Sequence, residues 1–305
     1  MRPRLRAHEP RHEQSRRHTG SQPPVTDRRM APALPHKSRT GPSRLLAVGL
    51  LGIVSVLGLT TACLPPPTPV TKPFPTDAYL RSYFVSRPGV EAVAAFDANS
   101  GVTYAYGPAT RFHTASTIKV AILGTLLVRA QDAKRPLTTG ERNLAARMIE
   151  FSDNAATDVL WSAIGRGSGL AQFMTRIGMR HTVPGPGPYW ILTETTTVDL
   201  TMLMRAVSYP NFVLTNDSRA YILQLMSNVT PSQRWGVSAA VRPGQRVALK
   251  NGWMVVQNIW GINSMGRIWG SDRDFVIAVL TNGSPTKNVG IATVEGATRI
   301  AMRGL

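Results

Sequence analysis

STIKVAILGTLLVRA, residues 116–130, is the most informative segment of this 305-residue chain. The stretch is strongly apolar and contains no proline, so it predicts a buried helix. It begins with Ser116, and Lys119 follows one helical turn later. Positions i and i+3 lie on the same face of a helix. The stretch therefore predicts a hydroxyl and an amine side by side at the start of a buried helix.

This pair suits nucleophilic catalysis. A serine hydroxyl needs a base within hydrogen-bond reach before it can act as a nucleophile near neutral pH. Burial lowers the proton affinity of a lysine, so Lys119 can serve as that base, and the positive end of the helix dipole favours negative charge developing at Ser116. The pattern S-x-x-K alone is weak, because a capping serine followed by a surface lysine is common. Here the residues flanking Lys119 are apolar, which favours the catalytic interpretation.

Two further short motifs follow in the chain. Ser152-Asp153-Asn154 separates two helical stretches, and Lys250-Asn251-Gly252 ends an apolar strand. Each has a simple structural alternative, a helix cap for the first and a turn for the second. All three motifs in this order are far more specific than any one of them.

With these motifs the sequence resembles the class A β-lactamases and related penicillin-recognising serine hydrolases, whose signature is S-x-x-K, then S-D-N, then K-T-G. The surrounding sequence is similar as well: RFHTASTIK at 111–119, MIEFSDNAA at 148–156 and ETTT at 194–197. The likeness runs from about residue 90 to the C-terminus. It implies a serine hydrolase that forms an acyl-enzyme, without a metal or an organic cofactor.

The resemblance also implies roles for individual residues. Ser116 would be the acylated nucleophile and Lys119 its base. Ser152 would relay a proton to the leaving nitrogen, assisted by the positive charge of Lys250. The substrate would be bound by Asn154, whose amide would hold the substrate's amide side chain, and by the Asn251-Gly252-Trp253 strand. The backbone N–H groups of Ser116 and Trp253 would form the oxyanion hole.

Three departures from the family pattern bear on activity. Asn251 stands where the family has Thr or Ser, a hydroxyl that helps to bind a substrate carboxylate. Ser116 and Ser152 are closer in sequence than in a β-lactamase. The loop at 181–190 (HTVPGPGPYW) contains no glutamate to position a deacylating water; Glu150 and Glu194 are the alternatives. Without such a base we expect an acyl-enzyme that forms but turns over slowly.

The remaining sequence predicts an α+β fold. We expect an antiparallel sheet built from both ends of the chain with a terminal helix, and an all-helical subdomain inserted between them. The expected strands are 90–96 and 102–106, which form a hairpin, and 247–250, 259–265 and 275–281. The expected helices after the first are 137–161 with a break at 151–152, 195–209, 216–226 and a terminal helix from about 291.

The N-terminal part has the layout of an export signal. Residues 45–62 are apolar and uncharged, basic residues precede them, and the only cysteine, Cys63, follows directly. This arrangement resembles a lipobox with Thr60 in place of the usual Leu, and the alternative is an uncleaved membrane anchor. Met30 is an alternative start to Met1. We expect an N-terminal extension and signal at 1–62, a proline-rich tether at 63–76 and a hydrolase domain at 77–305.

The sequence thus predicts an exported membrane lipoprotein facing the extracytoplasmic side. The formal net charge of +18 raises nucleic-acid binding as an alternative, but the basic residues after Cys63 are scattered, so we expect none. The expected substrate is a small-molecule β-lactam or a peptidoglycan-type amide. The alternatives are a D,D-peptidase or transpeptidase of the penicillin-binding type, and a non-catalytic cell-wall-binding lipoprotein.

Overall fold

A six-stranded sheet forms the centre of the protein in the computed structural model, which describes Pro67 and residues 69–305. The strand order is β1-β3-β2-β8-β7-β6, and every neighbouring pair is antiparallel except β1 and β3. The strands are β1 (Thr71–Lys72), β2 (Val90–Asp97), β3 (Thr103–Tyr106), β6 (Arg246–Val256), β7 (Ile259–Trp269) and β8 (Asp274–Ser284). The predicted fold class is confirmed, because β2, which comes early in the described chain, pairs along its length with β8, which comes near the C-terminus.

Both faces of the sheet are covered. Strand β2 shows this in its sequence, since VEAVAAFD is apolar at nearly every position rather than at alternate ones. Val93 and Ala95 pack into the core on one face of β2, whereas Ala92 and Phe96 belong to the core on the other. The sheet therefore separates two hydrophobic cores.

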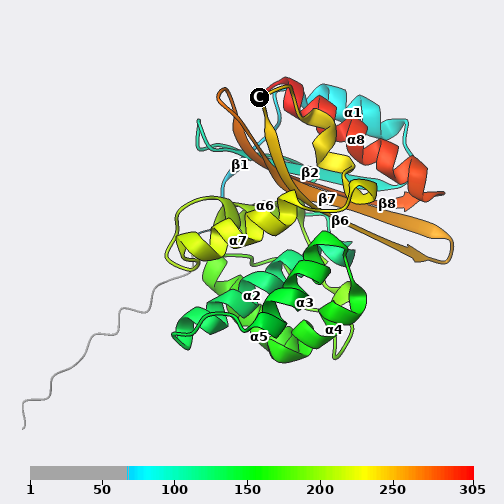
Figure 1. The fold of residues 1–305 in the computed structure, drawn as a ribbon. Coiled ribbons are helices and arrows are strands. Elements are labelled where there is room, and N and C mark those ends of the chain that lie inside the picture. The colour runs from blue at the N-terminus through cyan, green and yellow to red at the C-terminus, as the bar shows by residue number, and fades with distance from the viewer. Residues whose placement is uncertain (1–66, 68) are drawn as a thin grey trace, which may run out of the picture. The chain divides into compact units, whose positions relative to one another are not determined.

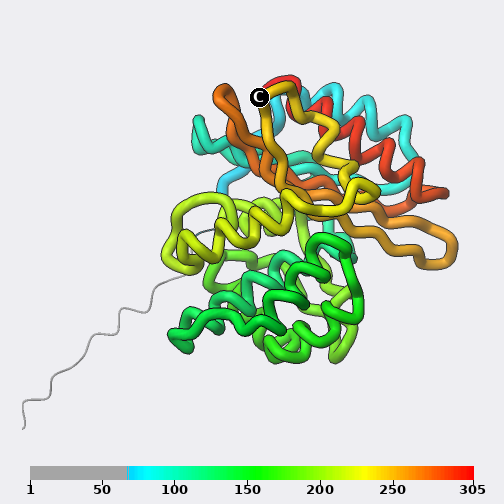
Figure 2. The backbone as a smooth tube through the Cα atoms, in the orientation of Figure 1, coloured from blue at the N-terminus to red at the C-terminus, as the bar shows by residue number. Residues whose placement is uncertain are grey.

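Two terminal helices cover the first face. Helix α1 (Asp77–Val85) packs beside α8 (Lys287–Arg303), and Figures 1 and 2 show these cyan and red segments side by side. Tyr83 of α1 lies over Gly296, and its hydroxyl donates to the Ala292 carbonyl oxygen at 3.0 Å. The terminal helix was predicted, although it begins at Lys287, where Thr286 caps it. Helix α1 was not predicted.

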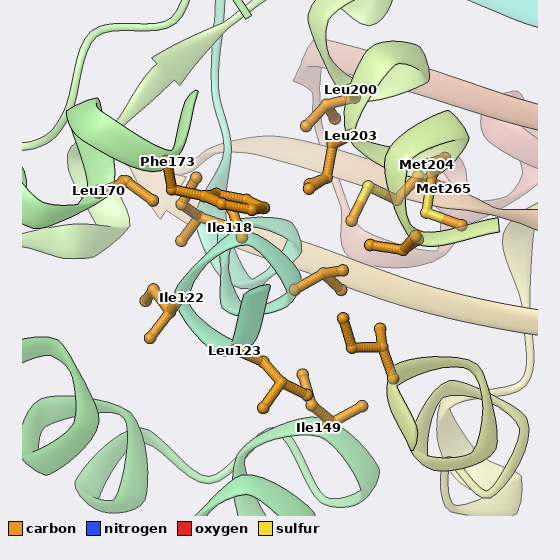
Figure 3. Packing of buried hydrophobic residues seen from close by; sticks show 14 of the residues in the cluster. Ile118, Ile122, Leu123, Ile149, Leu170, Phe173, Leu200, Leu203, Met204 and Met265 are labelled. Atoms are coloured by element: carbon orange, nitrogen blue, oxygen red, sulfur yellow. The ribbon is translucent and has the colours of Figure 1, made fainter. Parts of the chain in front are cut away.

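The inserted helices cover the second face (Figure 1). Helix α2 (Lys119–Asp132) lies inside this layer, and Figure 3 shows its side chains Ile122 and Leu123 among buried residues of the neighbouring helices. The predicted break in the second helical stretch is confirmed at Phe151–Asp153, and Thr196 caps α6. The other helices are α3 (Thr139–Glu150), α4 (Asn154–Ala163), α5 (Arg166–Ile177), α6 (Thr197–Ser208) and α7 (Asn216–Ser227).

Short elements connect the two layers. A two-stranded sheet joins β4 (Phe112–His113) to β5 (Glu194–Thr195), directly before the predicted nucleophile. Four 3-10 turns complete the described part: η1 (Ala115–Ile118), η2 (Trp190–Leu192), η3 (Pro231–Gln233) and η4 (Gly236–Ala240).

The expected tether contributes to the folded domain at its end. Thr71 and Lys72 pair with β3, and Phe74 is buried, so ordered structure begins before residue 77. The signal segment 45–62 and Cys63 lie outside the described residues. Of the helices that are described, none combines the length and the apolar character needed to cross a bilayer.

Candidate active site

The turn that carries Ser116 is held by hydrogen bonds from two sides. The backbone N–H of Thr114 donates to the Thr193 carbonyl oxygen at 2.7 Å, which ties the turn to the end of the 181–190 loop. On β7, the buried amide of Asn263 donates to the His113 carbonyl oxygen at 2.8 Å. Ala115 has a φ of +47°, a conformation that residues with a β-carbon seldom adopt. Such strain persists only where surrounding contacts enforce it, and it is frequent at functional sites.

Ser116 and Lys119 lie one helical turn apart, as predicted. Ser116 is on η1 and is partly exposed, whereas Lys119 is the first residue of α2 and is fully buried. The Lys119 Nζ atom donates to the carbonyl oxygen of Ser152 at 2.7 Å and to Oδ1 of Asn154 at 2.8 Å. Among the described residues the structure contains no hydrogen bond between the Ser116 hydroxyl and this amine. The amine instead points toward the second motif.

Ser152 lies between two amines. Its Oγ atom is 3.1 Å from Nζ of Lys119 and 3.0 Å from Nζ of Lys250. Ser152 has a φ of +58°, and the residue after it, Asp153, caps α4 through the Ala156 N–H while it pairs with Arg147. This helix cap fixes the strained residue that carries the hydroxyl. The three motifs therefore meet at one oxygen atom.

Burial changes the proton affinity of both lysines. Desolvation lowers the pKa of Lys119 to about 7, and the carboxylates of Asp153 and Asp158 oppose this effect. Desolvation also lowers the pKa of Lys250 well below its ordinary value, and the nearby Lys119 lowers it further. An amine with a pKa near 7 is partly neutral at physiological pH, so Lys119 can accept a proton there.

Strand β6 brings the third motif against the Ser116 turn. Lys250 is fully buried, and Gly252 faces the backbone of η1. A β-carbon at Gly252 would lie 2.8 Å from the backbone nitrogen of Ser116, closer than such contacts occur in proteins. Glycine at this position therefore allows the edge strand to approach the predicted nucleophile.

Asn154 and Trp253 border the same site. The Asn154 side chain is exposed, although its Oδ1 atom accepts from Lys119. Trp253 is partly buried, with the Lys287 ammonium 3.9 Å from its ring centre and the Trp235 ring 6.1 Å away. Asn154 begins α4 and Trp253 lies on β6, so each follows closely after a serine or lysine of the second or third motif.

Comparison with known proteins identifies the family. A family model described as the beta-lactamase enzyme family matches residues 135–305. The chain belongs to this family. Among curated proteins, "Putative lipoprotein LppW" of Mycobacterium tuberculosis is 26% identical over 215 residues, which cover 68% of each chain. The carbapenem-hydrolyzing beta-lactamase KPC of Klebsiella oxytoca is 24% identical over 258 residues, covering 71% of this chain and 84% of KPC.

Solved structures share the fold. A class A beta-lactamase from Mycobacterium abscessus superposes with a TM-score of 0.65 at 23% identity, covering 75% of this chain and 98% of that one. A class A beta-lactamase from Bacteroides cellulosilyticus gives a TM-score of 0.66 at 13% identity, covering 75% and 96%. The predicted resemblance to the class A beta-lactamase family is confirmed.

Asn251 differs from its expected role. This residue occupies the position of a substrate-binding hydroxyl in the β-lactamase signature, but its side chain is buried. Its Nδ2 atom donates to the carbonyl oxygens of Gln233 at 2.7 Å and Trp235 at 3.0 Å. Because both amide hydrogens bond to the backbone, the side chain holds the η3–η4 segment against β6 instead of facing a substrate. The expected contact of the Asn251 side chain with substrate is therefore corrected to a structural one.

A tryptophan from the 181–190 loop packs against Lys119. Trp190 is buried, and its ring centre lies 4.8 Å from Nζ of Lys119. Its indole N–H donates to Oδ1 of Asp158 on α4 at 2.7 Å. Neither residue is predictable from the motifs, because an aromatic residue in a Pro/Gly-rich loop carries no signal for where its ring will pack. The Asp158–Trp190–Lys119 contacts are a feature that only the structure reveals.

The two glutamates considered as deacylating bases lie elsewhere. Glu194 is on β5, about half exposed, and its carboxylate is 4.0 Å from Nδ1 of His113. Glu150 ends α3, and its carbonyl oxygen accepts from the Thr230 N–H. Among the described residues, neither carboxylate hydrogen-bonds to Ser116, Lys119 or Ser152. The only carboxylates that influence the Lys119 pKa belong to α4 or its cap.

Proposed function

We propose that this protein is an exported, lipid-anchored serine hydrolase that forms an acyl-enzyme at Ser116 with a β-lactam or a peptidoglycan-type amide. The observation that carries the proposal is the Ser152 hydroxyl, which lies within hydrogen-bond distance of two buried amines. Burying an amine destabilises a folded protein, and groups with strongly shifted pKa values cluster at functional sites. Their position beside the Ser116 turn supports acyl transfer.

The proposed chemistry uses each group once. Ser116 Oγ attacks the substrate carbonyl carbon, and its proton passes to neutral Lys119 directly or through one water. The backbone N–H groups of Ser116 and Trp253 stabilise the oxyanion of the tetrahedral intermediate. Ser152 then donates its proton to the leaving nitrogen as the C–N bond breaks, and it regains a proton from the lysine pair. Asn154 binds the amide side chain of the substrate.

Slow release of the acyl group is the second part of the proposal. The family resemblance implies that deacylation needs a carboxylate-activated water on the side of the 181–190 loop. In this protein the buried ring of Trp190 packs against Lys119 on that side, which supports a long-lived adduct. This feature favours a penicillin-binding, D,D-peptidase-like activity over efficient β-lactam hydrolysis.

Anchoring at Cys63 completes the proposal. The apolar segment 45–62 followed by the only cysteine supports export and lipidation. The name of the relative LppW describes a lipoprotein as well. The catalytic domain would then work outside the membrane, where peptidoglycan is accessible.

Time-resolved intact mass spectrometry with a fluorescent penicillin tests the function. The expected result is one covalent adduct per chain that persists for many minutes and is absent in Ser116→Ala. A transient adduct with released product would establish efficient hydrolysis instead and contradict slow deacylation. No adduct with either a penicillin or an acyl-D-Ala-D-Ala peptide would refute the proposed enzyme and leave a binding lipoprotein.

A further inference from the structure

A cavity lies away from the serine and lysine residues of the three motifs. It has a volume of about 640 Å³ and is formed by β2, the ends of α5 and α6, and the loop that follows α6. Volumes of 300–1,000 Å³ are typical of pockets for small molecules. Its wall is mainly apolar, and it contains the residues Phe96, Ile177, Met202, Phe212, Arg176 and Arg205. None of the residues assigned to acyl transfer lines it.

Arg205 is the distinctive group in this cavity. Its guanidinium lies 4.0 Å from the centre of the Phe96 ring and contacts the Met202 sulfur at 3.8 Å. Within residues 69–305 no carboxylate pairs with it, and burial lowers its pKa. Arg176, by contrast, is neutralised by Asp132 at 2.8 Å. Arg205 therefore supplies a desolvated positive charge with N–H donors available to an anion.

The neighbouring carboxylate, that of Asp274, already has a cationic partner. Asp274 pairs with Arg267 at 2.6 Å and accepts from the Tyr209 hydroxyl at 3.0 Å. Tyr209 packs edge-on against Phe96, so this network borders the cavity without neutralising Arg205. The cavity thus has a net positive charge that a ligand can complement.

The loop at the cavity mouth is fixed, although it exposes an aromatic side chain. The Asn211 side chain donates to the carbonyl oxygen of Ala206 and accepts from the N–H groups of Val213 and Leu214, all within 2.9 Å. Phe212, in the middle of this loop, is fully exposed. Phe212 also lines the cavity, so its ring adds apolar surface at the cavity mouth.

We propose that this cavity binds a small organic anion with an apolar body, a medium-chain carboxylate, with its carboxylate on Arg205 and its chain along Phe96, Met202 and Ile177. The apolar wall accommodates the chain, and charge complementarity with Arg205 selects the head group. This site is separate from Ser116 and does not depend on the hydrolase proposal.

Calorimetric titration of the purified full-length chain with decanoate tests the site. The expected result is saturable binding of one decanoate per chain, with at least about tenfold weaker binding of uncharged decanamide, because a charge-assisted hydrogen bond is lost. Equal binding of the two ligands, or no binding of decanoate, would refute the proposal. This comparison needs no variant and so does not depend on folding.

Variants locate the site. Arg205→Met is expected to weaken decanoate binding by at least about tenfold, whereas Arg205→Lys retains most of it. Arg246→Met is the matched control, since Arg246 also lies over an aromatic ring, Trp269, but outside the cavity. Unchanged binding in Arg205→Met would overturn the assignment. Labelling of Ser116 by penicillin is expected to be unchanged in Arg205→Met, which separates this test from that of the hydrolase.

A membrane lipid is the competing source of such an anion. Co-sedimentation of the wild-type chain and of Arg205→Met with phosphatidylglycerol vesicles distinguishes the two. Equal sedimentation of both chains is expected, because the site takes free carboxylates. Binding to vesicles that depends on Arg205, without binding of decanoate, would show that the head group of a bilayer lipid is the ligand and would refute the proposal.

Discussion

The three motifs meet at the Ser152 hydroxyl, which lies within hydrogen-bond distance of the Lys119 and Lys250 amines. The three sequence motifs predicted the residues Ser116, Lys119, Ser152 and Lys250, because each type has a distinct chemical role. Short motifs do not specify which atoms of these side chains form hydrogen bonds with one another. In the structure the Lys119 amine forms hydrogen bonds with Ser152 and Asn154. This arrangement depends on how α2, α4 and β6 pack.

The pH dependence of acylation tests Lys119. Its pKa is about 7, so the amine is protonated below that pH and cannot accept the Ser116 proton. We expect the rate of penicillin acylation to fall about tenfold per pH unit below 7 and to level off above it. Stopped-flow labelling between pH 5.5 and 8.5 measures this rate. A flat profile would exclude Lys119 as the base, and Lys119→Arg is expected to be inactive throughout.

Substitution of Asn251 tests the corrected assignment. Asn251→Thr restores the hydroxyl of the family signature, but a hydroxyl has one hydrogen and cannot donate to the carbonyl oxygens of both Gln233 and Trp235. We expect it to lower the free energy of unfolding by about 1–3 kcal/mol, because buried carbonyl oxygens lose their donors. Urea denaturation measures the change, with the exposed Asn288→Thr as control. Equal stability of the two variants would show that these hydrogen bonds contribute little.

At the scale of elements, strongly periodic or uniformly apolar segments were predictable, and weakly patterned ones were not. Helix α5 (RGSGLAQFMTRI) contains two glycines, which disfavour a helix. Gly169 is required there because a β-carbon would collide with the Ile164 carbonyl oxygen. Helix α1 is short and follows a proline-rich segment, so its sequence indicates a tether more than a helix. Tertiary packing stabilises both helices.

We expect the 181–190 loop to lengthen the lifetime of the acyl-enzyme through Trp190. Trp190→Ala removes the ring that packs on Lys119 and opens that side to water, so we expect the penicillin adduct to decay faster. Trp190→Phe keeps most of the apolar cover and is expected to decay almost as slowly as the wild type. The decay of adduct mass over time measures both rates.

Asp158 provides the control for that experiment. Asp158→Asn keeps an oxygen to accept from the Trp190 indole, so we expect no change in adduct lifetime. A longer lifetime in Asp158→Asn would identify Asp158 as a deacylating base. Equal lifetimes in Trp190→Ala and the wild type would contradict the role of the ring.

For the whole molecule, we expect the free energy of unfolding to depend on a buried carboxyl group outside the three motifs. Glu91 on β2 is 8% exposed, its Oε1 has no partner among the described residues, and burial raises its pKa to about 7. The folded state therefore keeps a proton that the unfolded state releases near pH 4.5. Stability contributed by this group falls as pH rises from about 4.5 to 7 and stays low above 7.

Replacing Glu91 with a residue that does not titrate removes this loss of stability above pH 4.5. We expect Glu91→Gln to exceed the wild type in unfolding free energy by about 1–3 kcal/mol at pH 8, with little difference at pH 4.5. Urea denaturation of both chains at the two pH values measures it. A constant difference across the range would mean that Glu91 does not titrate in the folded protein.

The whole fold was the most predictable level, because the sheet needs strands from both ends of the chain and the apolar segments there mark them. The candidate site depends on how the sheet and the inserted helices pack together, since Lys250 lies on the C-terminal strand β6 and Ser152 lies between the inserted helices α3 and α4. In the proposed mechanism this assembly forms an acyl-enzyme at Ser116. Peptide mapping of the penicillin-labelled full-length chain by tandem mass spectrometry identifies the acylated residue. We expect the acyl group on Ser116 alone; label on another residue, or a Ser116 peptide that stays unmodified at saturating penicillin, would refute this mechanism.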